Sequence, residues 1–562
     1  MKIYKLSLFA AALFAGSACN DIDEQVPEGS EMTAEQLQET YSADPTRAEA
    51  AFSGMFTMMG QPCYTFGEDQ GRADDFGYIA MALSQDLEGP DAISPNSGYN
   101  WFSTACSYTS RTPTYANPHL RYSMPYNQIG AANDIITTFG AREGQEDVYK
   151  VAQARAIRAF AYMALAPYFS FRYTGHENDL CVPIVTPETE DAANNPRATV
   201  KEVYDLIISD LNYAVEHLEG YDRGSDKSRI DQQVAYGLRA RANLAMEKWA
   251  EAASDAEKAA QGYTPASIAA VSTPSFYDIN DANWIWGIDI TKASVTDWPY
   301  QTSPSWIGSF SGNSYAAAVG VWYQINQLLY DKIPASDVRK GWWLDADAHS
   351  PLLNTISWAG VTGDAIVDLE ISDVKMAMVP YTNVKFGMMS GIGSDVNDND
   401  FPLMRVEEML LVQAEGYAKS GNEGKASEIL NSFVTTYRDP SYKIDGRGLS
   451  LTDEIWFQRR VELWGEGFGY SDAHRLGKPI VRVHGHYDTV TNEDGETTLK
   501  PVIDNPTNYD NAYQFNLASD NPWCLMRFSQ SEINANAAIV DNTGGRVPSR
   551  YDGLELRDGV TD

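Results

Sequence analysis

The strongest constraint on the fold is a set of amphipathic helical patterns that occur in neighbouring pairs. In residues 148–169 apolar side chains recur every three or four positions, from Val151 through Ile157 to Leu165. Residues 203–218 repeat this pattern with Val203, Ile207, Leu211 and Leu218. Such spacing places the apolar side chains on one face of each helix. The sequence therefore predicts helices that each bury one face against a neighbour.

Two further pairs carry small residues where helices would meet. Residues 234–248 and 250–260 are rich in alanine, and residues 407–419 and 424–437 are joined by the turn Ser420-Gly421-Asn422-Glu423. These helix–turn–helix units resemble tetratricopeptide repeats, but the pairs do not follow that repeat's period of about 34 residues. We therefore expect a mostly α-helical, interrupted tetratricopeptide scaffold with insertions.

The insertions are expected at about residues 84–127 and 270–400. Both stretches are rich in Gly, Ser, Asn, Pro, Trp and Tyr, which favours loops and short strands carried by the helices. Residues 284–290 alternate like a strand, so Trp284 and Trp286 are predicted to be core residues. Residues 487–501, with a turn at 492–495, predict a β-hairpin.

The N-terminus has the pattern of a secretory signal. Lys2 and Lys5 precede an apolar run at residues 6–14 that is too short to span a bilayer, and small residues then lead to Cys19. This arrangement resembles a bacterial lipobox, so we expect residues 1–18 to be a lipoprotein signal peptide and Cys19 to carry the lipid anchor. An ordinary signal peptide with a chance cysteine is the alternative. Residues 19–40 would be a tether, and 41–562 a single domain.

Charge and cysteine content exclude several functions. The 562 residues include 42 Lys+Arg against 77 Asp+Glu, a net charge of −35, which repels nucleic acid and anionic lipid head groups. The 13 Trp and 32 Tyr exceed ordinary core needs and favour a recognition surface. Cys63, Cys106, Cys181 and Cys524 are too widely spaced for a CxxC metal site, and one or two disulfides with any pairing remain open.

Several motifs together resemble one family. Residues 43–58 look like its first helix, residues 126–133 its Y-x-x-I-x-x-A-N helix, and residues 155–169 with 182–184 a further segment; residues 404–417 are similar to another conserved helix. The most specific match is residues 455–477, which resemble I-x-x-E-R-x-x-E-L-x-x-E-G-x-x-x-x-D-L-x-R, with Gln458 in place of the usual Glu. On these motifs the chain is identified as a member of the SusD/RagB family of surface lipoproteins.

The resemblance implies a fold and a function. It implies a SusD-like helical scaffold that is not an enzyme, needs no cofactor, and binds an extended glycan or, less often, a peptide. It also implies a lipid-anchored position on the cell surface at the outer membrane, as a lid over a SusC-like TonB-dependent transporter. Within the specific motif, Arg459, Arg460, Glu462 and Glu466 are interpreted as ion pairs along a scaffold helix.

Two aromatic stretches are the predicted ligand site. A sugar ring can lie with its C–H face on Trp or Tyr while its hydroxyls bond to polar side chains, so both types are needed together. The predicted set is Tyr99, Asn100, Trp101, Trp298, Tyr300 and Trp306. For each residue, packing of the loop against the helices is the structural alternative.

Signals for metal binding and catalysis are weak. Asp395, Asn397 and Asn399 begin like a calcium loop, but Asp400 and Val406 stand where an EF-hand needs Gly and Glu. No carboxylate pair or nucleophile motif marks a catalytic centre. Two alternatives to a glycan-binding lipoprotein remain: a surface binder of peptide or another nutrient, and a surface glycoside hydrolase.

Overall fold

The computed structural model divides the chain into two compact units, residues 1–52 and 53–562. It describes residues 36, 40–41, 43–63, 74–94, 102–292, 311–313, 323–369, 378–394, 396, 398–483, 486–491, 497–502, 514–546 and 561. The predicted signal peptide, residues 1–18, and Cys19 lie outside the described residues. The tether at 19–40 and the single domain at 41–562 stay predictions.

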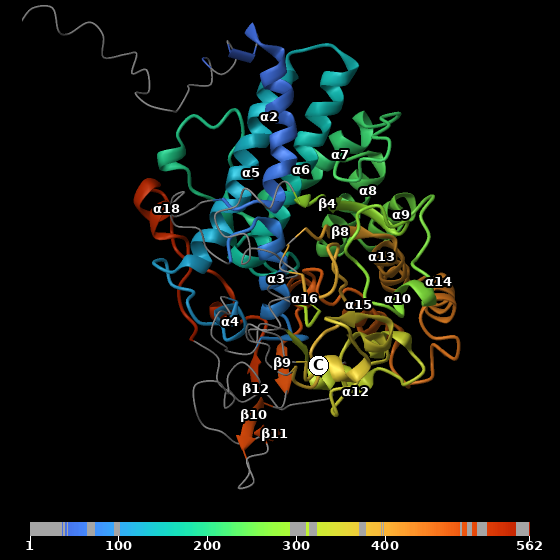
Figure 1. Ribbon diagram of the computed structural model, residues 1–562. Helices are drawn as coiled ribbons and strands as arrows, with labels where there is room; N and C mark the ends of the chain where they lie inside the picture. The colour runs from blue at the N-terminus through green and yellow to red at the C-terminus, as the bar shows by residue number, and fades with distance from the viewer. Residues whose placement is uncertain are drawn as a thin grey trace, which may run out of the picture. The chain divides into compact units, whose positions relative to one another are not determined.

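Paired helices form the scaffold of residues 53–562, as the sequence predicts (Figure 1). The pairs are built from helices that follow one another along the chain: α5 (Ala116–Gly140), α6 (Gln145–Phe169), α7 (Val200–His217), α8 (Gln232–Ala245), α9 (Trp249–Ala259), α13 (Val406–Lys419), α14 (Glu423–Tyr437), α15 (Leu451–Glu462) and α16 (Gly469–Leu476). From α5 to α9 each helix packs on the next, and α13 packs on both α14 and α15. The mostly α-helical, interrupted scaffold is therefore confirmed.

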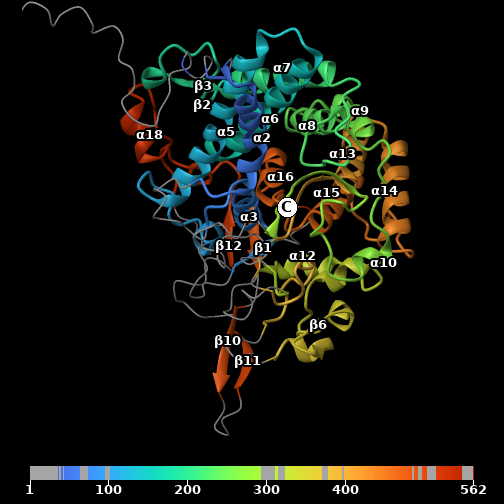
Figure 2. The same ribbon diagram turned by 45° about the horizontal axis from the view of Figure 1, so that its top comes forward.

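The series of helices continues across a long insertion. Helix α13 packs directly on α9 although residues 260–405 separate them, and Figures 1 and 2 both show these helices side by side. Gly416 of α13 allows this contact, because a Cβ atom there would lie 2.5 Å from the carbonyl oxygen of Trp249. Ala252, Ala256 and Ala259 of α9 are fully buried. The small residues thus mark the helix contacts, as expected.

The first predicted insertion is only partly a loop. Residues 84–88 belong to α3 (Tyr78–Glu88), and residues 116–127 form the first half of α5, so the expected loop at 84–127 is wrong at both ends. The proline and asparagine residues of this stretch predict a loop, but a helix can accommodate them for a physical reason. Pro118 lies in the first turn of α5, where a helix has no partner for the backbone N–H. Pro125 lies within α5, whose side chains Leu120, Arg121, Met124 and Gln128 are buried.

The second insertion contains short elements around one strand pair. Strand β4 (Trp284–Ile288) pairs antiparallel with β8 (Phe401–Arg405), which leads directly into α13. Trp284 and Trp286 are both fully buried, which confirms their predicted place in the core. Between these strands lie β5 (Gln324–Ile325), α12 (Gln327–Lys332), η4 (Val338–Trp342), η5 (Pro351–Thr355), β6 (Ser357–Trp358), β7 (Val361–Thr362) and η6 (Gly363–Ile366).

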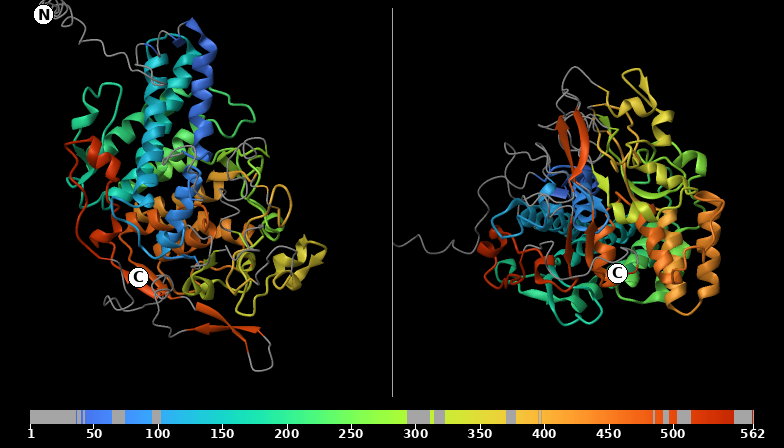
Figure 3. Two further views of the ribbon diagram at one scale, coloured as in Figure 1. Left: turned by 60° about the vertical axis from the view of Figure 1, so that its left-hand side comes forward. Right: turned by 90° about the horizontal axis from the view of Figure 1, so that it is seen from below.

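The predicted hairpin is present near the C-terminal end. Strand β10 (His486–Thr491) pairs antiparallel with β11 (Thr497–Val502), with Thr491 opposite Thr497. Next to it, β9 (Ile480–Val483) pairs with β12 (Gln514–Leu517), and Figure 3 shows both strand pairs. The remaining elements are α2 (Pro45–Thr57), η1 (Met58–Gly60), β1 (Ala92–Ile93), α4 (Ser103–Cys106), β2 (Leu180–Pro183), η2 (Ala192–Asn194), β3 (Arg197–Thr199), α10 (Ile268–Val271), η7 (Pro522–Cys524) and α18 (Gln530–Ala535).

The described residues also answer two questions about cysteines and membrane-spanning helices. Cys63, Cys106, Cys181 and Cys524 are free thiols, so none of the disulfides left open by the sequence is formed. Within the described part of the chain, no helix has both the length and the apolar character needed to cross a membrane.

The most specific motif forms a buried charge network instead of ion pairs along one helix. Both oxygens of the Glu462 carboxylate accept hydrogen bonds from Arg438 at 2.8 Å, and Arg405 and Arg339 each donate a further bond at 3.2 Å. All four side chains are inaccessible to solvent. Although burial opposes ionisation, these guanidinium groups hold the pKa of Glu462 well below its usual value. The predicted pairing along the helix is therefore wrong in its partners, which come from distant segments.

The other charged residues of the motif also have partners outside α15. Glu466 binds Arg405 at 2.7 Å and the ammonium of Lys385 at 2.8 Å. Arg460 binds Asp91 at 2.6 Å, next to β1, and Arg459 binds Asp472 of α16 at 2.5 Å. Gln458, which replaces the usual Glu, accepts from Arg339 and donates to Glu454. The end of α15 thus connects the helices, the second insertion and the start of the first loop.

We expect Glu462→Gln to destabilise the protein strongly, because it leaves buried guanidinium groups without their counter-charge. Removing one partner of a buried ion pair costs about 3–5 kcal/mol. The matched control is Glu257→Gln, since Glu257 is half exposed and pairs with Lys425 at the surface; that change should cost less than about 1 kcal/mol. Urea unfolding at pH 7 measures both, and equal losses for the two variants would contradict the assigned role of Glu462.

Candidate functional site

The six predicted ligand residues lie outside the described residues. Tyr99, Asn100 and Trp101 fall in the gap at residues 95–101, and Trp298, Tyr300 and Trp306 in the gap at residues 293–310. The residues that flank these gaps are described. They show where the two loops leave the scaffold and where they return to it.

A short strand pair joins the base of the first loop, at residues 95–101, to the base of the second loop, at residues 293–322. Strand β1 ends one residue before the first gap, and β5 begins one residue after Tyr323, where the gap at 314–322 ends. The two strands pair antiparallel, with Ala92 opposite Ile325 and Ile93 opposite Gln324. Segments more than two hundred residues apart in the sequence are therefore hydrogen-bonded neighbours at the loop bases.

Aromatic rings fill the space beside this strand pair. Phe102, the first described residue after the first loop, lies edge-on to Tyr323 with ring centroids 6.4 Å apart. It lies edge-on to Phe76 as well, at 6.0 Å. All three side chains are buried, and edge-to-face pairs of this kind stabilise beyond their buried area. We call β1, β5, Phe76, Phe102 and Tyr323 the loop platform.

The second loop has an additional attachment point at residues 311–313. The Asn313 side-chain amide donates to the carbonyl oxygens of Val384 and Phe386 at 3.0 and 2.9 Å. The backbone N–H of Gly312 donates to Asn383 at 2.9 Å, and Asn383 in turn donates to the carbonyl of Tyr323. Residues 382–386 therefore hold two parts of the second loop: its middle, at residues 311–313, and its far end, at Tyr323.

The buried charge network fixes this segment and the loop platform. Lys385 is fully buried among the rings of Phe276, Trp342 and Phe386, and its ammonium donates to the carbonyls of Glu462 and Trp464. On the other side, the Trp464 indole N–H donates to the carbonyl of Asp91, at 2.9 Å. The end of α15 is thus hydrogen-bonded directly to Asp91 at the first loop base and to Lys385 in the segment that holds the second loop.

Asp400 holds the near end of the second loop. One carboxylate oxygen accepts the backbone N–H of Ile279 and the other that of Ile290, both at 2.8 Å. Ile290 lies just after β4 and three residues before the gap at 293–310. Burial raises the pKa of Asp400 to about 7, in opposition to the two backbone hydrogen bonds, which lower it.

The weak calcium candidate gains no support. Asp395 and Asn397 lie outside the described residues. Asn399 is buried, its side-chain oxygen accepts the backbone N–H of Met389, and its amide donates to the carbonyl of Gly387. Among the described residues, no cluster of three His, Cys, Asp or Glu side chains could hold a metal ion.

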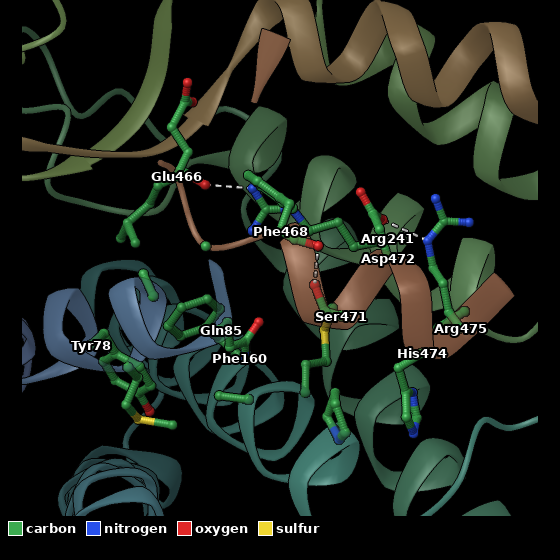
Figure 4. A pocket seen from close by; sticks show the side chains of 18 of the residues that line it. Tyr78, Gln85, Phe160, Arg241, Glu466, Phe468, Ser471, Asp472, His474 and Arg475 are labelled. Atoms are coloured by element: carbon green, nitrogen blue, oxygen red, sulfur yellow. Dashed lines mark hydrogen bonds and ion pairs between the residues drawn. The ribbon is translucent and has the colours of Figure 1, made fainter. Parts of the chain in front are cut away.

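A second feature is an aromatic pocket that the sequence does not predict. It has a volume of about 160 Å³ and is lined by residues of α3, α6, α7, α8, β8, α15 and α16 and by the turn before α16. In Figure 4, Tyr78 and Gln85 come from α3, Phe160 from α6, and Ser471, Asp472 and Arg475 from α16. No local motif brings these residues together, because the pocket forms only when seven separate elements pack. The one sequence signal is that Arg459, Glu466 and Phe468 belong to the specific motif.

The sequence matches two models of one protein family. A SusD-like family model described as starch-binding and associating with the outer membrane matches residues 78–244, and the SusD family model matches residues 360–544. The chain belongs to the SusD/RagB family. No curated protein matches the chain.

Solved structures share the fold. A SusD-like carbohydrate binding protein from Bacteroides vulgatus has 24% sequence identity and a TM-score of 0.67, with 88% of this chain and 97% of that chain covered. A SusD superfamily protein from Bacteroides thetaiotaomicron has 19% identity and a TM-score of 0.67, covering 89% and 99%. Surface glycan-binding protein A from Bacteroides thetaiotaomicron, in complex with laminarihexaose, has 16% identity and a TM-score of 0.62, covering 88% and 99%.

We expect Asp400→Asn to change how stability depends on pH. The folded-state pKa of about 7 lies above the ordinary value of 3.8, so the folded protein holds this proton more tightly than the unfolded chain. The carboxyl therefore contributes stability that is present below about pH 4 and is lost as the pH rises to about 7. Between pH 4 and pH 8, the free energy of unfolding of the wild type should fall relative to that of the variant by roughly 4 kcal/mol.

Urea unfolding at both pH values measures this difference. Asp347→Asn is the matched control, because Asp347 is exposed and precedes no loop base. The same pH dependence for the wild type and both variants would contradict the raised pKa of Asp400.

Proposed function

We propose that the protein is a surface glycan-binding lipoprotein that captures oligosaccharide or polysaccharide for a SusC-like TonB-dependent outer-membrane transporter. Membership of the SusD/RagB family supports this proposal, as does the starch-binding description of the family model that matches residues 78–244. The fold is shared with a glycan-binding protein in complex with laminarihexaose. The transporter partner and the lipid anchor are part of the proposal.

The pairing of β1 with β5 is the observation that carries the proposal. The six predicted ligand residues, Tyr99, Asn100, Trp101, Trp298, Tyr300 and Trp306, are divided between two loops that are far apart in the sequence. The strand pair and the ring contact between Phe102 and Tyr323 join the bases of those loops. An extended glycan needs several aromatic faces and polar groups within one surface. Joined loop bases favour one shared binding surface over two separate ones.

A rigid base also suits binding of a flexible ligand. Ordering a glycan on the surface costs conformational freedom, and a surface that is already held in place adds less to that cost. The loop platform is buried and is tied to α15 through Asp91, Lys385 and Trp464. The proposed role is therefore binding and delivery without catalysis, in line with the weak catalytic signals of the sequence.

We expect Trp101→Ala and Trp306→Ala each to weaken binding of a recognised glycan by about tenfold or more. Loss of an aromatic face that stacks on a sugar removes on the order of 1–2 kcal/mol, and 1.4 kcal/mol is tenfold. Calorimetry against a panel of polysaccharides, including laminarin and starch, measures the affinities. Tyr115→Ala is the matched control, because Tyr115 is a half-exposed aromatic residue outside the two loops.

The outcomes separate the three functions. Unchanged glycan affinity in both tryptophan variants would show that the six-residue site is wrong. Binding of peptides but of no glycan would favour the peptide-binding alternative. Release of reducing sugar from any polysaccharide, abolished by neutralising a single Asp or Glu, would favour the glycoside hydrolase.

We expect Cys19→Ser to release the protein from the membrane. Acyl chains on Cys19 are the proposed anchor, and the negative net charge opposes electrostatic attachment to anionic lipids. In a bacterial host, fractionation should find the wild type with outer membranes and the variant in soluble fractions. Ser17→Ala, which keeps the small residue before the cleavage point, is the control. Equal membrane retention of Cys19→Ser would contradict lipid attachment at this residue.

A further inference from the structure

The aromatic pocket is built from residues other than those of the loop platform. Its walls come from Tyr78 of α3, Phe160 of α6 and Phe468 of the turn before α16, which Figure 4 labels, and from Phe401 of β8. The guanidinium groups of Arg241 and Arg459 each lie 5.1 Å from the centre of the Phe468 ring. Cationic contact with its ring holds Phe468 in place, so the pocket presents fixed aromatic surfaces.

The charges around the pocket compensate one another. Arg241 binds Glu408 at 2.6 Å, Arg459 binds Asp472 at 2.5 Å, and Arg475 binds Glu415 at 2.7 Å. Glu466, at the opposite side, is paired with Lys385 and Arg405. Each charged side chain that lines the pocket already has a partner of opposite charge. A charged ligand would therefore find no unpaired charge in the pocket to balance its own. The electrostatics therefore favour a neutral ligand.

Gln85 is the polar group that points to a ligand. Gln85 has 9% of its surface exposed and lines the pocket, and its side-chain amide makes no hydrogen bond within the part of the chain that the structure describes. A ligand hydroxyl could both donate to the amide oxygen and accept from the amide nitrogen. His474 adds one acceptor: burial lowers its pKa to about 4, so the ring is neutral, and Nε2–H donates to the carbonyl of Ser170 at 2.9 Å. Nδ1 then carries a lone pair.

We propose that this pocket binds a small neutral aromatic molecule with one hydroxyl group, of the size of phenol or cresol. A cavity of about 150 Å³ lined by apolar side chains accepts benzene, and this pocket, at about 160 Å³, is comparable. Its aromatic walls offer edge-to-face contacts to one ring. A monosaccharide has a ring of similar size but carries hydroxyls around it, and the rings of Phe160, Phe401 and Phe468 offer those hydroxyls no hydrogen-bond partner. This site is additional to the proposed glycan surface.

Fluorine NMR with 4-fluorophenol tests the proposal on the full chain. We expect saturable broadening and shift of the ligand signal with the wild type, and no displacement by glucose. Gln85→Leu should weaken 4-fluorophenol binding by about three- to tenfold, the value of one hydrogen bond. The same variant should bind fluorobenzene, which lacks the hydroxyl, as tightly as the wild type does. Gln261→Leu is the matched control, because Gln261 is exposed and lies outside the pocket.

A second variant tests the location. Ala164→Phe places a ring into the pocket from α6, where Ala164 is partly exposed and lines it, and should abolish binding of both probes. Circular dichroism verifies that each variant is folded. Absence of saturable 4-fluorophenol binding to the wild type would overturn the proposal. So would unchanged binding in Ala164→Phe, or an equal loss for both probes in Gln85→Leu.

Discussion

The Glu462 carboxylate, buried among Arg339, Arg405 and Arg438, is the interaction on which the rest of the structure depends. Taking such charges out of water is costly, and only close, multiple hydrogen bonds offset that cost. Here the partners come from η4, from the end of β8 and from the residue after α14, so the network forms only when these segments are in place. The charges therefore specify one arrangement of helices and insertion, whereas apolar packing would tolerate several.

The same end of α15 serves two different features. Arg460 and Trp464 bind Asp91 beside β1, which holds the loop platform, while Arg459 and Phe468 line the aromatic pocket. Lys385 joins both to the Glu462 network through the carbonyls of Glu462 and Trp464. Residues of the scaffold motif thus position the proposed ligand surface through Asp91, without being part of that surface. A substitution at Arg460 would act on ligand binding through the placement of β1.

The sequence predicted the helices better than the sites, for physical reasons. Helices α6 to α9, α13 and α14 each show their own apolar stripe, so local periodicity suffices to find them. The first half of α5 was missed because Pro118 and Pro125 indicate a loop, although Pro118 occupies the helical turn that tolerates proline. The partners of Glu462 and the residues of the pocket could not be predicted, since contacts between distant segments leave no periodic pattern in the chain. The six loop residues remain a prediction from residue type and family resemblance.

The direct contact between α9 and α13 has a consequence for how members of this family can diverge. Gly416 leaves room for α9 and α13 to pack against each other. The insertion at residues 260–405 therefore leaves and re-enters the scaffold at neighbouring points. The entropy of closing such a loop grows only with the logarithm of its length, about 0.6 kcal/mol for each doubling. Residues can therefore be added to or removed from this insertion at little thermodynamic cost while the helices stay unchanged. A fold closed in this way lets selection alter the inserted loops and the scaffold independently.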